Sequence, residues 1–137
     1  MGTSSNRARR ILALQEQLHR IERWKLLDLQ RRAADLEAQR QDLIAALNDD
    51  DALQGLFIDA RARRLTSIAR QAEDAERQQQ VQAACVEEQA TRVACADRLS
   101  SKASAEEQRA RDRRALLEII EALVGPPTQA SRKIKEP

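Results

Sequence analysis

Apolar residues recur at alternating intervals of three and four in the first third of the chain. One set is Ile11, Leu14, Leu18 and Ile21, and a second is Leu29, Ala33, Leu36, Leu43 and Leu47. This spacing holds a seam against a partner helix. Between the two sets the phase slips by steps of four, which predicts a local unwinding of the supercoil without a helix end. We therefore predict a helix over about residues 7–47, preceded by a disordered start at 1–6.

The acidic run that follows Asn48 interrupts this pattern. Three Asp side chains oppose the dipole at a helix C-terminus but complement it at the N-terminus of the next helix. Asp51 with Gln54 three residues on resembles a capping box. We predict a tight turn at 48–54, and so short a connection favours antiparallel neighbours.

A second helix is predicted over about residues 54–124. Its seam begins with Leu65, Ile68, Ala72 and Ala75, weakens to Ala, Gln and Cys over 78–91, and continues through Val86, Val93 and Leu99. Gly125-Pro126-Pro127 ends the helix, and residues 125–137 are expected to form a disordered basic tail. Ser104 with Glu107 is another capping-box pattern, so a third helix starting near 104 stays open. The absence of Gly and Pro there favours one continuous helix.

The composition supports helices packed along a thin seam. Charged residues make up 34% of the chain and aromatic residues 1%, which is typical of long helices and coiled coils. The predicted fold is all-α, a long antiparallel two-helix coiled-coil hairpin. The first helix would be about 60 Å long and the second about 105 Å, so the second overhangs the first.

The overhang combines apolar and basic residues. Its apolar members are Leu116, Leu117, Ile119, Ile120, Leu123 and Val124, and its basic members are Arg109, Arg111, Arg113 and Arg114. Uncovered apolar area of this kind usually marks a binding surface. We name residues 109–124 the docking end, in which Arg109, Arg111, Arg113, Arg114, Leu116 and Ile120 are the candidate contact residues.

The chain shows no pattern of catalytic or cofactor-binding residues. It has one His, no Tyr and no glycine-rich phosphate loop, so we expect neither an enzyme nor a small-molecule substrate, cofactor or metal. His19 is expected on the solvated helix face. Cys85 and Cys95 with one distant His do not form a zinc set, and both are expected to be small seam residues.

Two aromatic side chains, Trp24 and Phe57, are candidate anchors. Trp24 lies in the phase slip, where it widens the apolar face. Leu56, Phe57 and Ile58 follow the turn directly. These three residues either close the hairpin tip as a hydrophobic plug or present an exposed anchor to a partner.

The charge pattern bears on partners and location. Residues 56–124 carry twelve basic and twelve acidic groups, so no nucleic acid is expected as a partner, because phosphate binding needs net positive charge. A nucleoid-associated coiled coil is accordingly the weaker alternative.

A second alternative function is a structural homodimer or adaptor that pairs through the 78–91 seam. Without a signal peptide or a long apolar run, we expect a cytoplasmic protein, peripheral to the membrane at most.

The layout resembles the FliJ family of flagellar export proteins and the YscO-like stalks of type III secretion. The resemblance rests on a basic start (Arg9-Arg10-Ile11-Leu12-Ala13-Leu14), a helix of about 40 residues, a tight turn, apolar residues after it, a longer second helix and a short basic tail. It covers nearly the whole chain, as a likeness of layout rather than of a residue motif.

The resemblance implies a non-enzymatic stalk that acts with a hexameric export ATPase and escorts export chaperones. The basic, Leu-rich ends of the rod, with Arg9, Arg10 and Leu14 at the start, would contact acidic surfaces of the ring. The tip at Leu56, Phe57 and Ile58 would be free for an export-gate component.

Overall fold

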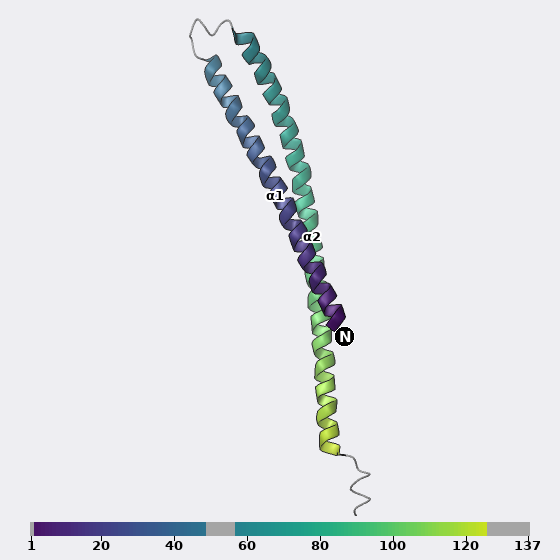
Figure 1. Cartoon of the computed structure of the whole chain (residues 1–137). Helices are drawn as coiled ribbons and strands as arrows, with labels where there is room; N and C mark the ends of the chain where they lie inside the picture. Colours follow the sequence, from purple (N-terminus) through teal and green to yellow (C-terminus); the bar gives the residue numbers. More distant parts are fainter. Residues whose placement is uncertain (1, 49–56, 126–137) are drawn as a thin grey trace, which may run out of the picture. The chain divides into compact units, whose positions relative to one another are not determined.

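The structure, a computed structural model, describes residues 2–48 and 57–125. It contains helix α1, Gly2–Leu47, and helix α2, Ile58–Val124, and no strand among the described residues. The chain divides into two units, residues 14–94 and residues 1–13 with 95–137. Each unit contains a segment of α1 packed against a segment of α2 (Figure 1). The predicted all-α pair of helices is confirmed.

Hydrogen bonds across the 14–94 unit show the direction of the pair. Gln15 is bonded to Gln89, Glu22 to Gln82, and the carbonyl of Ala46 to Arg61. Residue numbers rise along α1 as they fall along α2, so the two segments are antiparallel. The predicted turn at 48–54 lies, apart from Asn48, outside the described residues.

The apolar core of this unit is thin. Leu36, Ile68 and Ala75 are buried, and Ala33, Leu43 and Ala72 pack around them. These residues belong to the seams predicted from the sequence. Three of the six are Ala and three are larger, so few large side chains are available to stabilise this pair.

In the other unit the seam consists of still smaller residues. Ser5, Ala96 and Ser100 are buried, and the hydroxyls of Ser5 and Ser104 lie 3.4 Å apart. The prediction of a disordered start was wrong, since α1 begins at Gly2. The small Ser and Ala side chains let the first turns of α1 pack directly onto α2.

The first predicted seam of α1 was also wrong. Ile11, Leu14, Leu18 and Ile21 are all exposed. The residues that face α2 lie one position further along: Leu12, Gln15, His19 and Glu22, followed by Leu26 and Leu29. This inward series keeps the three-four spacing into Ala33 and Leu36, so no phase slip occurs.

The seam of α2 keeps the same regular spacing. Val86 and Val93 are half-buried as predicted, but Leu99 is exposed and its neighbours Ala96 and Ser100 are buried instead. Small side chains, rather than Leu99, fill the narrow space between the helices.

Backbone hydrogen bonds mark where α1 and α2 end. At the end of α1 the N–H of Asn48 donates to the carbonyl of Ile44 at 3.0 Å. Helix α2 is unbroken through Ser100 and Ser104, so no third helix starts there. Gly125 has a φ of 59° and its N–H donates to Glu121 at 3.1 Å, the conformation of a glycine that ends a helix. Residues 126–137 lie outside the described part of the chain.

Truncation of a core residue tests this seam. Ile68→Ala removes buried methyl and methylene groups from a side chain that is 4% exposed, so we expect it to lower the free energy of unfolding by about 2 to 5 kcal/mol. The matched control Ile120→Ala alters a side chain that is 47% exposed. It should change the free energy of unfolding by less than about 1 kcal/mol. Urea denaturation followed by circular dichroism measures both. Equal losses would contradict the assignment of the core.

Candidate partner-binding surfaces

The docking end is the part of α2 that extends beyond the start of α1. In the unit that contains both, Ser5 lies against Ser104, and α2 continues past this level (Figure 1). Every side chain from Arg111 to Val124 is exposed. Leu123, at 81%, is the most exposed large apolar residue in the described chain. From Arg111 on, the side chains of the docking end are therefore accessible to solvent within this unit.

Polar and apolar side chains segregate around this helix. Leu116, Ile120 and Leu123 follow one another at spacings of four and three, which places them on one face. Arg113 precedes Leu116 by three residues and shares that face, while Glu118 lies on the opposite side. The result is an apolar face about one helix turn beyond a cluster of guanidinium groups.

The other candidate residues lie apart from the docking end. Arg9 and Arg10 are exposed. Ser5 lies against Ser104, and from there α1 runs towards Arg9 and Arg10 while α2 runs the opposite way towards Arg109. Leu14 is exposed in the other unit. The structure thus presents these residues to solvent without joining Arg9 and Arg10 to the docking end.

Of the predicted tip residues, the structure describes two. Phe57 is 58% exposed and Ile58 is also exposed. Leu56 lies outside the described residues.

Sequence reasoning missed an exposed apolar surface on α1. We name Ile11, Leu14, Leu18 and Ile21 the α1 stripe; each is between 37% and 55% exposed. Trp24 follows it and is 69% exposed. The sequence did contain a signal for the inward face of α1. A second series, whose members each follow a stripe residue by one position, runs from Leu12 through Leu26 and Leu29 to Ala33 without a phase slip.

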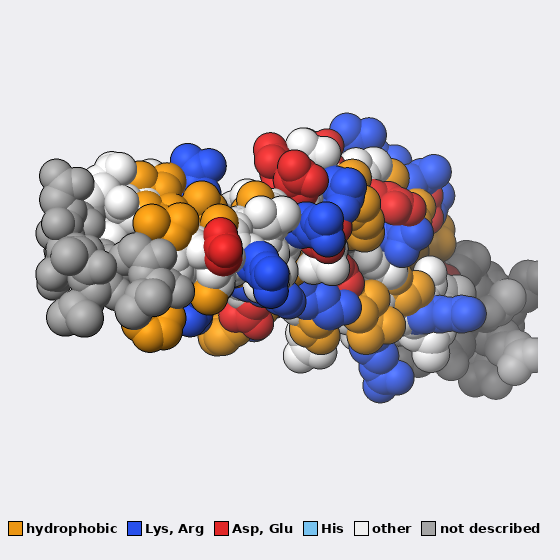
Figure 2. All heavy atoms as spheres, turned by 90° about the horizontal axis from the view of Figure 1, so that it is seen from above, with side chains coloured by type: hydrophobic (Ala, Val, Ile, Leu, Met, Phe, Trp, Pro, Cys, Tyr) orange, Lys and Arg blue, Asp and Glu red, His pale blue; other side chains and the backbone are white. Residues whose placement is uncertain are grey.

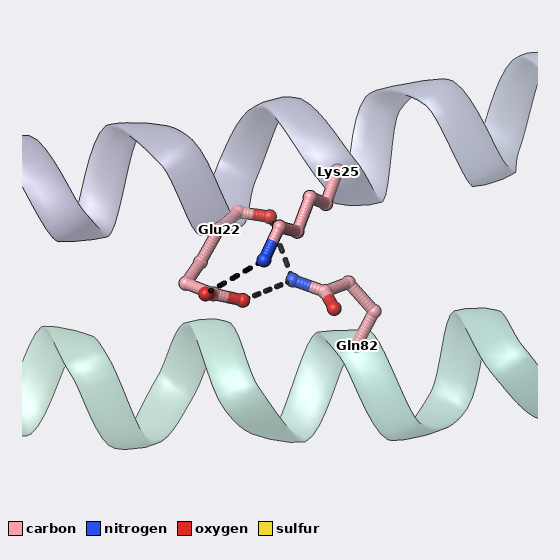
Figure 3. Close-up of polar contacts among 3 residues, drawn as sticks. All are labelled: Glu22, Lys25 and Gln82. Atoms are coloured by element: carbon pink, nitrogen blue, oxygen red, sulfur yellow. Dashed lines mark hydrogen bonds and ion pairs between the residues drawn. The ribbon is translucent and has the colours of Figure 1, made fainter.

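Gln15 and Glu22 of α1 lie in the seam, and two glutamines of α2 donate hydrogen bonds to them. The Gln82 amide donates to the backbone carbonyl of Glu22 at 2.9 Å and to its carboxylate, as Figure 3 shows. The Gln89 amide donates to the carbonyl of Gln15 at 3.2 Å and also to its side-chain oxygen. Among the described residues no buried side-chain polar atom lacks a partner.

The bond from Gln82 changes the acidity of Glu22. It stabilises the carboxylate and lowers the pKa of Glu22 from its ordinary value of 4.5, although partial desolvation opposes the shift. Lys25, whose ammonium group lies 3.4 Å from the carboxylate, lowers the pKa further.

The two cysteines and the single histidine differ in exposure. Cys85 is half-buried in a shallow groove beside Glu22 and Arg92, whereas Cys95 is exposed, so the seam prediction was wrong for Cys95. His19 is half-buried on the inward face, not solvated as predicted. Basic and acidic side chains are mixed on the face drawn in Figure 2.

Among the described residues, no group of three or more His, Cys, Asp and Glu side chains could hold a metal ion. Neither helix contains a stretch that is long and apolar enough to cross a membrane.

Comparisons with protein-family models, with curated proteins and with solved structures gave no match to this chain.

The lowered pKa of Glu22 predicts acid sensitivity. A carboxylate whose pKa is lower in the folded state stabilises the fold above its unfolded pKa, and this contribution is lost as the pH falls through the folded pKa. We expect the melting temperature of the wild type to fall more steeply below about pH 4.5 than that of Glu22→Gln. Thermal unfolding across pH 2–7, with Glu118→Gln on an exposed face as control, measures this. Parallel curves for wild type and Glu22→Gln would exclude the linkage.

Proposed function

We propose that this chain is a non-enzymatic stalk and escort protein of a flagellar or type III protein-export apparatus, and that it binds the export ATPase through the docking end. The observation that carries the proposal is the uncovered apolar face of α2, with Arg109, Arg111 and Arg113 beside it.

The chemistry of the docking end suits a protein surface with acidic and apolar parts. Guanidinium groups make bidentate hydrogen bonds with carboxylates, and Leu116 and Ile120 add apolar area next to them. Large apolar anchors surrounded by polar groups are typical of protein interfaces. A hexameric ATPase ring with acidic inner surfaces is a partner of this kind.

The architecture supports the same function. Antiparallel helices of 46 and 67 residues, the second extending past the first, correspond to the layout on which the resemblance to the FliJ family rests. In this proposal the exposed Phe57 and Ile58 serve an export-gate component or a chaperone, and the protein works in the cytoplasm at the inner face of the membrane.

The structure weakens the alternative of a homodimer paired through residues 78–91. Gln82 and Gln89 in that segment already bond to Glu22 and Gln15 of the same chain. A dimer that used these two glutamines would have to break those bonds.

Charge reversal at the docking end tests the proposal. The variant Arg111→Glu, Arg113→Glu, Arg114→Glu with Leu116→Glu should weaken binding to the export ATPase of the same organism at least about tenfold, or about 1.4 kcal/mol. Binding is measured by surface plasmon resonance with the purified hexamer. Reversing the charges repels acidic ring residues and desolvates new carboxylates.

The matched control reverses arginines elsewhere on α2. Arg63→Glu, Arg64→Glu and Arg70→Glu alter exposed residues far along the helix from the docking end, and should leave ATPase binding unchanged. Wild-type affinity of the docking-end variant would refute the docking surface. Neighbouring genes for an export ATPase or gate would support the export role, and a wild type that does not bind the ATPase would refute it.

A further inference from the structure

The four arginines of the docking end divide between two sides of α2. All four are exposed, and successive residues of an α-helix are turned by about 100° about its axis. With this rotation Arg109 and Arg113 lie on the same side of the helix as Ile120. Arg111 and Arg114 lie on the far side. The arginines that can accompany the apolar residues into a contact are therefore two, not four.

The carboxylates that follow the arginines gather on the far side. Glu118 and Glu121 are exposed and are both turned away from Ile120 by well over a quarter of a turn. Asp112 lies at the edge of the apolar side, where it accepts a hydrogen bond from the Gln108 amide at 3.0 Å. From residue 113 on, the apolar side carries no carboxylate. An acidic partner surface is thus attracted to one side of the docking end and repelled by the other.

The apolar side is wide. Its large residues are each between 47% and 81% exposed and together cover about 160° of the helix circumference: Leu116, Leu117, Ile119, Ile120, Leu123 and Val124. The seam that a helix presents to one partner helix in a coiled coil is narrower than about 100°. An arc as wide as this one is covered by a groove with two walls, which is how amphipathic helices bind to protein grooves.

We propose that the docking end binds the export ATPase through one side only, laid in an apolar groove with an acidic rim. We name this side the binding face; it consists of Arg109, Arg113 and the six large apolar residues. In this arrangement Arg109 and Arg113 contact carboxylates of the rim, whereas Arg111, Glu118 and Glu121 stay in solvent. The proposal rests on the proposed function and adds to it the side of α2 that the ATPase recognises.

A pair of single charge reversals separates the two sides. Arg113→Glu puts a carboxylate on the binding face and should weaken binding to the purified ATPase hexamer at least about tenfold in surface plasmon resonance. Arg111→Glu makes the same change of net charge two residues earlier on the far side. It should change the Kd less than about twofold, because long-range attraction is lowered equally in both variants.

A second pair tests the apolar part of the binding face. Ile120→Glu and Ala122→Glu each add one carboxylate near the C-terminus of α2, where both oppose the helix dipole to a similar extent. Ile120→Glu lies on the binding face and should weaken binding at least about tenfold, whereas Ala122→Glu lies on the far side and should change the Kd less than about twofold. Circular dichroism should show equal helix content, because both residues are exposed.

The possible failures are distinguishable. Equal losses within both pairs would show that the ATPase contacts α2 on all sides, which would overturn the one-sided contact and leave the docking end as the binding site. Wild-type affinity in all four variants would place the contact elsewhere on the chain and overturn both. A wild-type chain that does not bind the ATPase would refute the export function, and the binding face with it.

Discussion

The structure depends on one constraint: an unbroken helix that packs on one partner can present only one seam to it. Helix α1 has no Pro and no break between Gly2 and Leu47, so its rotation about its own axis is set once. The core formed by Leu36, Ile68 and Ala75 sets it. Turning α1 by one residue to bury Leu14 and Leu18 would move Leu36 out of that core. The exposure of the α1 stripe is thus a consequence of packing some twenty residues away.

This constraint explains which parts of the fold the sequence predicted. Where one apolar series stands alone, as at Leu29, Ala33 and Leu36, the spacing identified the inward face correctly. Two adjacent series compete between residues 11 and 22, and local pattern favoured the more apolar one. Only continuity with the distant core distinguishes them. Leu99 was misplaced for a related reason, since the narrow seam admits Ala96 and Ser100 more readily than a large side chain. The exposed docking end was predictable because no second helix could reach it.

The rotation of α1 that buries Leu36 also places Gln15, His19 and Glu22 in the seam. Two glutamines of α2 supply hydrogen bonds to Gln15 and Glu22. A buried carbonyl or carboxamide without a partner costs about 1 to 3 kcal/mol, and Gln82 and Gln89 supply donors to the groups of Glu22 and Gln15. Such bonds require a fixed pairing of residues along the two helices. They therefore specify the register of a seam whose Ala and Ser side chains would otherwise tolerate sliding, because small residues interlock weakly.

The same constraint leaves the docking end without a neighbour. The hydroxyl of Ser5 lies against that of Ser104 near the start of α1, and α2 continues from there with every side chain from Arg111 to Val124 exposed. Apolar side chains at these positions bury no area within the unit, so they add little to the stability of the helix pair. A substitution at Leu116 or Ile120 can therefore change binding to a partner while the fold is kept.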